Sequence, residues 1–447
     1  MNLCEQIIDT LQQWQEEMTN LQHNAPQNTL SLVEHEEGAL LLGKRIAQLA
    51  LAYQLRALGT GYKNASRPCC CGKRQRFQRH SARSIQTLAG VVQYQRAYYR
   101  CRLCQASSFP LDEALQQGQR EISAGVERIL GLLSAHSSFP QVEKLLAELS
   151  VVSLSGRQIE TIAEDIGKQA QVQLQEEKEA AWRDAGVEPE SAQITKGKTF
   201  IVEMDGVQVG LQDGTWQEVK CGVIYEVSQR AQTQEGRWEL LKKQVCAYRG
   251  EVGEFRQQLW ALSCRVGIRE CDEVVILGDG ASWIDQTKEW LFPKARRILD
   301  YYHASQRVWL VAEGRWGEGS VKGKNWAQKQ VKKLKMGEAK EVIKSLKGLR
   351  IKEFGAEKVR QEAVKYLSAR VEQMRYGEYE ESGLPIGSGA IESSCKQIVT
   401  SRCKQAGMRW SESGVDAILA LRCFVLNNRY EELRAKPKIE IEWLKVA

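Results

Sequence analysis

Apolar and polar residues recur along this chain with two different periods, and the change of period divides it into parts. Between residues 2 and 60, apolar side chains return every three or four positions, which predicts amphipathic helices. Residues 121–170 show the same period, and Ser137 or Ser138, together with Ser155, stand where helix N-caps are expected. This second stretch predicts a helix, a short turn and a helix, as in a helix-turn-helix that reads DNA, although simple helix packing gives the same pattern.

From residue 198 onward the apolar runs are short and typical of strands. The predicted elements are strands at 198–211, 215–228 and 236–250, a helix at 253–267 and a strand at 272–280. A further apolar run at 296–299 predicts a fifth strand, and residues 303–380 return to a helical pattern. Three strands, a helix and a strand is the order of a ribonuclease H-like α/β core, so we expect a multidomain α+β protein whose core carries a helical insertion.

Cysteines gather at both ends of a predicted β-hairpin that turns near Ala89 and Gly90. A Cys-x-Cys pair precedes the hairpin and a Cys-x-x-Cys pair follows it, which is the arrangement of a zinc ribbon with a structural Zn²⁺. The predicted ligands are Cys69, Cys71, Cys101 and Cys104. Cys70 and His80 remain alternatives within the N-terminal part of the site.

Composition favours a large intracellular protein. The chain has 447 residues, of which 43% are hydrophobic and 27% charged, and 13 are cysteines. Its apolar runs are shorter than the ~20 residues that cross a bilayer, so we expect no membrane association. The N-terminus carries early acidic residues and lacks the pattern of a secretion signal, so we expect a cytoplasmic protein with reduced thiols.

Positive charge is concentrated in one segment. The net charge is +7, but residues 296–375 hold 20 Lys and Arg against 9 Asp and Glu, a local excess of 20 − 9 = +11. Such a segment predicts a polyanionic partner. The expected nucleic-acid contacts within it are Lys322, Lys324, Lys329, Lys332 and Lys333. Lys396, Arg402 and Lys404, beyond this segment, are further expected contacts.

Three acidic residues stand at places where a sheet presents catalytic groups. Asp205 ends the apolar run of the first predicted strand (FIVEMDG), Asp279 ends that of the fourth, and Glu392 follows a Gly-Ser-Gly loop at a helix start. In a ribonuclease H-like sheet the first and fourth strands are neighbours, so the carboxylates of Asp205 and Asp279 can meet at one place. Glu392 could complete the set from its helix. Hard oxygen ligands suit two Mg²⁺ (or Mn²⁺) ions, which at a separation of roughly 3.5–4 Å clamp a phosphodiester between them. The alternative interpretations do not involve catalysis. Asp205 and Asp279 would be ordinary turn residues at strand ends, and Glu392 would pair with Lys396 one helix turn later.

Several stretches resemble a known family. They are CCCGKRQRF, AYYRCRLCQASSFPLD, VEMDGVQV, LGDGASWI, RRILDYYHAS and LPIGSGAIESSCKQIVTSRCKQAGMRWS, within residues 67–424. The sequence resembles bacterial insertion-sequence transposases of the DDE type, close to the Kra-type group of the Mutator-like superfamily. The resemblance implies metal-dependent DNA cleavage and strand transfer, with Asp205, Asp279 and Glu392 as the catalytic triad. It also marks His303, in an Asp-x-x-His signature, as a catalytic candidate, with a core-packing histidine as the alternative.

The resemblance also sets expectations for partners and domains. The expected partners are double-stranded DNA, at transposon ends and at target sites, and at least one further copy of the chain. The expected location is the cytoplasm, in association with the nucleoid. The expected segments are 1–60 (N-terminal helices), 61–112 (zinc ribbon), 113–195 (helix-turn-helix-like DNA-binding region), 196–310 (first part of the core), 311–383 (basic helical insertion) and 384–447 (Glu-bearing and C-terminal helices). A non-catalytic DNA-binding regulator and a ribonuclease H-like nuclease are the alternative functions.

Overall fold

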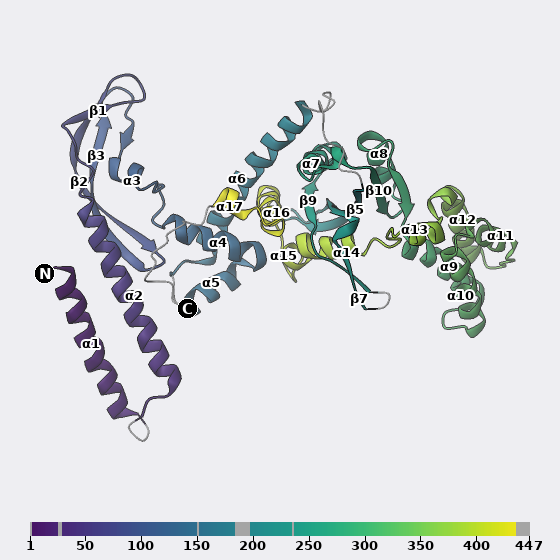
Figure 1. Ribbon diagram of the computed structural model, residues 1–447, viewed down its shortest axis with the longest axis horizontal. Coiled ribbons are helices and arrows are strands. Elements are labelled where there is room, and N and C mark those ends of the chain that lie inside the picture. Colours follow the sequence, from purple (N-terminus) through teal and green to yellow (C-terminus); the bar gives the residue numbers. More distant parts are fainter. Residues whose placement is uncertain (1, 26–28, 150–151, 184–196, 235–236, 435–447) are drawn as a thin grey trace. The chain divides into compact units, whose positions relative to one another are not determined.

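The chain forms a mixed α/β protein with N-terminal helices and more than one domain. The computed structural model describes residues 2–25, 29–149, 152–183, 197–234 and 237–434 (Figure 1). These residues fall into two compact units, residues 2–163 with Arg434, and residues 164–433. The predicted boundary between the segments 113–195 and 196–310 lies outside the described residues.

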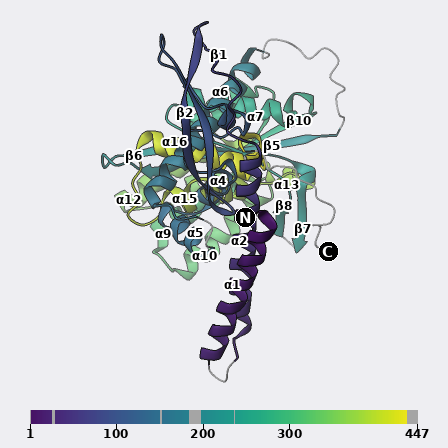
Figure 2. The same cartoon turned by 90° about the vertical axis from the view of Figure 1, so that its left-hand side faces the viewer.

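The first unit begins with two helices, α1 (Leu3–Asn24) and α2 (Leu32–Ala57), which lie side by side (Figure 2). Each starts with a capping box, in which a side chain of the first turn and the cap residue satisfy each other's backbone N–H groups. The indole of Trp14 donates to the Gly38 carbonyl at 2.9 Å and so joins the two helices. The predicted N-terminal helices are confirmed.

A four-stranded antiparallel sheet follows, in the order β1-β2-β3-β4. Its strands are β1 (Ser66–Pro68), β2 (Arg74–Thr87), β3 (Gly90–Cys101) and β4 (Ser107–Ser108). The predicted hairpin is confirmed, with Thr87 paired to Gly90 across the turn. It is longer than predicted, because residues 74–83 carry so many polar side chains that their alternation is hidden in the sequence.

Four helices follow the sheet along the chain. They are α3 (Pro110–Ala114), α4 (Ala124–His136), α5 (Phe139–Glu148) and α6 (Gly156–Arg183). Ser138 forms a capping box with Gln141, and the backbone N–H of Ser155 donates to Gln158 at 2.9 Å. The predicted helices and their serine caps are therefore confirmed, and α6 continues from the first unit into the second.

The second unit is built on a five-stranded sheet in the order β11-β10-β5-β6-β9. Its strands are β5 (Thr199–Gly210), β6 (Trp216–Glu226), β9 (Gln244–Arg249), β10 (Glu273–Gly278) and β11 (Arg296–Leu299). Neighbours among β5, β6 and β9 are antiparallel, whereas β10 is parallel to both β5 and β11. The predicted fourth and fifth strands are confirmed.

The prediction of a single strand over 236–250 is wrong. A separate antiparallel pair is formed by β7 (Arg230–Gln234) and β8 (Arg237–Leu240), after a short 3₁₀ turn, Val227–Gln229. The Leu241 N–H donates to the Gln229 carbonyl at 2.8 Å and closes the base of this hairpin, and the chain rejoins the sheet at Gln244. A run of strand-forming residues does not reveal which strand each part pairs with. The sequence pattern therefore does not separate β8 from β9.

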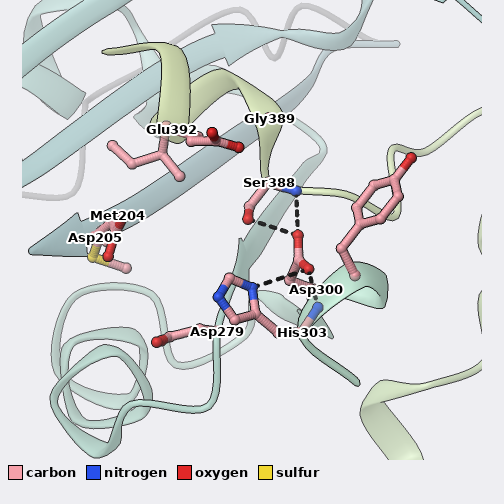
Figure 3. A pocket seen from close by; sticks show the side chains of 10 residues that line it. Met204, Asp205, Asp279, Asp300, His303, Ser388, Gly389 and Glu392 are labelled. Atoms are coloured by element: carbon pink, nitrogen blue, oxygen red, sulfur yellow. Dashed lines mark hydrogen bonds and ion pairs between the residues drawn. The ribbon is translucent and has the colours of Figure 1, made fainter. Parts of the chain in front are cut away.

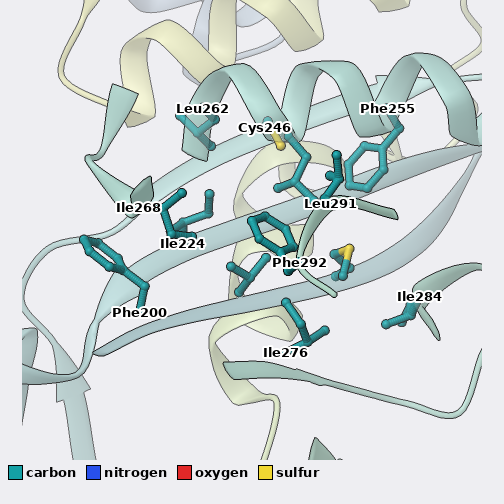
Figure 4. Packing of buried hydrophobic residues seen from close by; sticks show 13 residues of the cluster. Phe200, Ile224, Cys246, Phe255, Leu262, Ile268, Ile276, Ile284, Leu291 and Phe292 are labelled. Carbon is teal, nitrogen blue, oxygen red and sulfur yellow. The ribbon is translucent and has the colours of Figure 1, made fainter. Parts of the chain in front are cut away.

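Helices cover both faces of the sheet. On one face, α7 (Val252–Arg265) and α8 (Ser282–Leu291) pack on a fully apolar cluster that includes Val202, Met204 and Ile276 (Figure 4). On the other face lie α14 (Gly389–Cys395) and α16 (Glu412–Leu426). Because side chains alternate along a strand, the odd-numbered residues 203 and 205 of β5 point toward α14.

The remaining helices form the insertion and the C-terminal part. Between β11 and α14 lie α9 (Tyr301–Trp316), α10 (Val321–Lys335), α11 (Ala339–Gly348), α12 (Phe354–Ser368) and α13 (Tyr376–Glu381), which confirms the predicted helical insertion. After α14 come a π turn (Lys396–Thr400), α15 (Ser401–Cys403), α16 and α17 (Tyr430–Leu433). None of the helices in the described part of the chain combines the length and apolar character that a bilayer span requires.

Candidate functional site

The register of the central strands brings Asp205 and Asp279 to the same level. Leu277 of β10 pairs with Glu203 of β5, and the two strands run parallel. Each aspartate lies two residues further along its own strand direction, so both side chains reach the same edge of the sheet. The prediction that both residues end a strand holds for Asp279, which directly follows β10, but is wrong for Asp205, because β5 continues to Gly210 in pairing with β6. The parallel pairing of β5 with β10 makes the two residues neighbours.

Asp205, Asp279, His303 and Glu392 line one cavity of about 490 Å³ at this edge (Figure 3). The three carboxylates come from β5, from the end of β10 and from the first turn of α14. The carboxylate oxygens of these three residues are not all within 4.8 Å of one another. Among the described residues, only a group of four cysteines has its ligand atoms that close together. The carboxylates therefore surround an open space instead of closing on a single point.

The electrostatics of the cavity favour a bound cation. Burial raises the pKa of Asp205, and the charge of Asp279 raises it further. Two carboxylates that repel each other at the wall of a cavity are stabilised by positive charge between them. Carboxylate oxygens are the donors that Mg²⁺ and Mn²⁺ prefer, so this set fits the expected ions.

Asp300 joins the start of α9 to the loop before α14. Its carboxylate accepts hydrogen bonds from the Ser388 backbone N–H at 2.5 Å and the Ser388 hydroxyl at 2.6 Å, and from the His303 backbone N–H at 2.7 Å. Burial raises the pKa of Asp300, but the hydrogen bonds from His303 and Ser388 outweigh burial and leave the pKa below its usual value. Asp300 is thus a buried anion that fixes the Gly-Ser-Gly loop.

His303 lies between this anion and the cavity. Its Nδ1 is 3.1 Å from an Asp300 oxygen, and 52% of its side chain is exposed. The hydrogen bond to Asp300 raises the pKa of His303, and the charges of Asp279 and Asp205 act in the same direction. A half-exposed imidazole held by a carboxylate and facing acidic groups contradicts the alternative of a core-packing histidine.

Glu203 supports the candidate site and is absent from the residues predicted from the sequence. It is fully buried, accepts a hydrogen bond from the Tyr225 hydroxyl at 2.7 Å, and accepts another from the Ile391 backbone N–H at 2.8 Å. Burial raises the pKa of Glu203 to about 7. Ile391 immediately precedes Glu392, so Glu203 holds the helix turn that presents Glu392 to the cavity. A carboxylate within an apolar strand, two residues before Asp205, was the signal available in the sequence.

The turn that carries Asp279 is held from two sides. Arg297 donates to the Gly278 carbonyl at 3.2 Å and also to the Asp279 carbonyl, while its charge pairs with Asp285 at 2.8 Å. From the helical insertion, Arg370 donates to the Gly280 carbonyl at 2.7 Å. The insertion therefore helps to position a residue of the cavity.

The four predicted cysteine ligands form a second site, in the first unit. The ligand sulfurs of Cys69, Cys71, Cys101 and Cys104 all lie within 4.8 Å of one another, and this group includes neither Cys70 nor His80. The Cys69 and Cys104 sulfurs are 3.4 Å apart and the Cys71 and Cys101 sulfurs 3.7 Å apart. The edge of a tetrahedron with Zn–S bonds of ≈ 2.3 Å is about 3.8 Å long, so the cluster has the size of a zinc site. A hydrogen bond from the Cys71 backbone N–H lowers the pKa of the Cys69 thiol to about 6, which favours the metal-binding thiolate.

The predicted nucleic-acid contacts divide into accessible and buried residues. Lys322, Lys324, Lys329 and Lys332 are exposed on α10, and Lys396 and Lys404 are exposed beyond α14. Lys333 is half-buried and lies 3.8 Å from Glu338. The prediction for Arg402 is wrong, because its side chain is fully buried and lies over the Trp410 ring at 5.0 Å. No local pattern around Arg402 predicts that this arginine packs inward.

With this geometry in view, comparisons with known proteins place the chain in a family. A family model for UPF0236, described as an uncharacterised protein family, matches residues 26–436. The chain belongs to the UPF0236 family. Its cavity and its cysteine cluster both lie within the matched residues.

UPF0236 relatives with similar sequences occur in two different bacteria. A UPF0236 protein of Caldanaerobacter subterraneus subsp. tengcongensis is 26% identical over 376 residues, which cover 82% of this chain and 71% of the relative. Another from the same organism is 25% identical over 379 residues, covering 82% and 71%. A UPF0236 protein in a vanSb 3' region of Streptococcus gallolyticus is 26% identical over 373 residues, covering 79% and 75%. The name of the first relative joins 11 designations, and that of the second joins 4.

Proposed function

We propose that this protein is a DNA transposase of the DDE type, which cuts and joins DNA at the ends of an insertion sequence. The observation that carries the proposal is the meeting of Asp205, Asp279 and Glu392 in one cavity, although they lie far apart in the sequence. The sheet order β11-β10-β5-β6-β9, with its mixed directions, supports a ribonuclease H-like core, because that core presents acids from its first and fourth strands and from a later helix.

The residues of the cavity have separate tasks in this proposal. Two Mg²⁺ ions, when bound, would supply Lewis-acid activation of the attacking and leaving oxygens. Asp205 and Asp279 would hold both ions from the sheet, and Glu392 would hold one from the helix. His303, whose pKa is raised by Asp300, would donate a hydrogen bond from its free ring nitrogen to a phosphate oxygen. Glu203 and Asp300 would act as positioning residues.

The names of the relatives support the proposal that genes of this family move within a genome. The 11 designations joined in one name belong to a single strain, as do the 4 of the second. We take each designation as a separate gene copy. A gene that is present many times in one genome is what repeated transposition produces, whereas a dedicated regulator is expected as a single copy.

The rest of the molecule suits DNA as the substrate. The cysteine cluster would bind a structural Zn²⁺ and hold the hairpin of β2 and β3 as a zinc ribbon. That hairpin, the α5–α6 pair and the lysines of α10 would contact transposon ends and target DNA on the nucleoid. Because the reaction joins two ends, the working form would be at least a dimer.

The decisive experiment is cleavage of DNA that carries the sequences flanking the gene. The purified chain is expected to nick this DNA in Mg²⁺ or Mn²⁺ and to transfer the freed 3′ end to a plasmid. Asp279→Ala and Glu392→Ala should each reduce cleavage by at least ~10²-fold, since each removes a metal ligand that acts in the transition state. Zinc binding and binding to the same DNA should persist in both variants.

The same assay separates the alternatives. Cleavage that is unchanged in Asp279→Ala and Glu392→Ala would rule out this site as the catalytic one. Binding to the flanking repeats without any cleavage would point to a DNA-binding regulator. Cleavage of structured DNA or RNA without a footprint on the repeats would point to a ribonuclease H-like nuclease.

A further inference from the structure

A second cavity lies on the other side of α14 from the acidic residues. It has a volume of about 460 Å³. Its wall includes residues of α14 and of the β7–β8 hairpin, which forms a two-stranded sheet of its own outside the five-stranded sheet. The lining residues that matter here are Arg230, Trp238, Lys243, Gly389, Ser393 and Gln397.

Gly389 belongs to both cavities. It lines the acidic cavity together with Glu392, and it lines the second cavity together with Ser393. Ala390, Ser393 and Gln397 follow one another at helical spacing along the face of the second cavity, whereas Glu392 faces the first. An extended chain that passes Gly389 would therefore contact both cavities.

The second cavity combines an exposed aromatic ring with positive charge. Trp238 is 52% exposed, and the Arg230 guanidinium lies over its ring at 4.6 Å. Lys243 is half-buried beside it and donates to the Ser394 hydroxyl at 3.0 Å. A half-exposed ring with one cation over it and a second cation lining the same cavity is a combination that stacks a base and binds its phosphate.

Charge compensation within the fold accounts for only part of this arrangement. Buried Glu203 lies close enough for its charge to act on both Arg230 and Lys243, so these cations also stabilise a buried carboxylate. Trp238 carries no charge to compensate, and with the Arg230 guanidinium over its ring it still keeps 52% of its surface exposed. Its exposure beside the cations points to a ligand.

We propose that this second cavity binds one unpaired nucleotide of the DNA strand next to the phosphodiester that is cleaved. Trp238 stacks on the base, and Arg230 and Lys243 hold its phosphate, while Ser393 and Gln397 offer hydrogen bonds to the base edge. This inference deepens the proposed function and rests on it for the identity of the strand as DNA. A nucleotide unpaired beside the cut would open the duplex and let the acids reach the phosphate.

The test measures binding, so it does not require cleavage. The full chain is titrated in EDTA into fluorescein-labelled oligodeoxythymidylate of about twenty nucleotides, and into an oligonucleotide with a central 2-aminopurine, whose emission falls on stacking. Trp238→Ala is expected to weaken binding roughly 5- to 100-fold, the range for one stacked base, and to abolish the fall in emission. Trp238→Phe keeps a flat ring and should retain most of both signals.

A matched control tests whether any exposed tryptophan has this effect. Trp290 on α8 is 55% exposed, has Arg256 5.8 Å from its ring, and lies outside the second cavity. Trp290→Ala should leave both signals unchanged. Thermal unfolding and circular dichroism of each variant verify the fold.

The outcomes separate this inference from the proposed function. Equal binding and an equal fall in emission for the wild type and for Trp238→Ala would overturn the inference, even if the protein cleaves its DNA ends. Loss of both signals in Trp238→Ala would support it, even if no DNA is cleaved. Displacement of the oligonucleotide by polyglutamate, with an affinity that does not depend on Trp238, would assign the cavity to an acidic polypeptide and overturn it as well.

Discussion

At the scale of single residues, two buried carboxylates organise the cavity. Asp300 holds Ser388, and Glu203 holds the backbone of Ile391, so the loop and first turn that carry Glu392 are tied down at both ends. Neither carboxylate needs to touch a substrate to matter. An error of about 1 Å in the position of a metal ligand is enough to reduce catalysis strongly.

The raised pKa of Glu203 predicts a pH dependence of stability. The pKa is about 7 in the folded chain against an ordinary value of 4.5. Below about pH 4.5 the carboxyl is protonated in both states, and between about 4.5 and 7 only the unfolded chain releases the proton. The free energy of unfolding should therefore fall as the pH rises through this window, by at most about 1.4 kcal/mol per pH unit from this group, and should level off above it.

The variant Glu203→Gln removes this contribution. Melting temperatures of the variant and of the wild type are measured in EDTA between about pH 4.5 and 8. The melting temperature of the variant minus that of the wild type should increase with pH up to about 7 and then stay constant. Parallel melting curves across the whole range would contradict the prediction.

Gly280 should tolerate no larger side chain. A Cβ atom at this position would lie 2.6 Å from the Tyr366 hydroxyl and 2.7 Å from Nε of Arg370. We expect Gly280→Ala to destabilise the protein by about 1–3 kcal/mol, measured by denaturant unfolding, and to reduce cleavage because the Asp279 turn is displaced. Gly253→Ala on α7 is the control, since its Cβ would meet no atom within 4 Å. Equal stability of Gly280→Ala and Gly253→Ala would show that the insertion does not pack closely on this turn.

At the scale of elements, the cysteine cluster is the contact that joins both ends of the β2–β3 hairpin. A short antiparallel sheet buries little apolar surface, so a metal at its open end would supply much of its stability. Here the apolar part of the sheet, with Ile85, Val92 and Tyr94, packs near the turn against Leu55 of α2, while the cysteines lie at the far end.

Neighbouring cysteines give a matched pair of variants for this site. We expect Cys69→Ser to lower the zinc content from about one ion per chain to nearly none and to lower the melting temperature, because it removes one of four ligands. Cys70→Ser changes an exposed thiol outside the group and should leave both quantities unchanged. Atomic absorption and calorimetry measure them. If Cys70→Ser lost zinc and Cys69→Ser retained it, the ligand assignment would be incorrect.

At the scale of the whole molecule, charge is distributed unevenly. Residues 296–375 carry 20 − 9 = +11, while the chain as a whole carries +7, so the rest is net acidic at 7 − 11 = −4. DNA is therefore expected to bind mainly along the helical insertion, which also contacts the Asp279 turn through Arg370.

The salt dependence of DNA binding measures this contribution. Replacing the exposed residues Lys322, Lys324, Lys329 and Lys332 by Ala should reduce the slope of log Kd against log salt by up to about 3–4, because each phosphate contact contributes ≈ 0.9. Lys178→Ala is the control, since Lys178 is paired with Glu254 at 2.9 Å. A slope that is unchanged in the fourfold variant would exclude α10 from the DNA-binding surface.

The sequence by itself determined the local elements and the chemistry available to them. Helical and strand periods placed most elements, and the spacing of the cysteines identified the four thiols that gather in space. These features depend on neighbours within a few residues of each other, so they can be read along the chain.

Only the tertiary structure decided which elements meet. It separated the β7–β8 hairpin from the sheet, placed Arg402 in the interior, and made Glu203 the support of the helix that carries Glu392. Strand partners and burial depend on residues that lie far apart along the chain, as with the 188 positions between Glu203 and Ile391. Periodicity cannot report such contacts, because it describes only which way a side chain points and not what it will face.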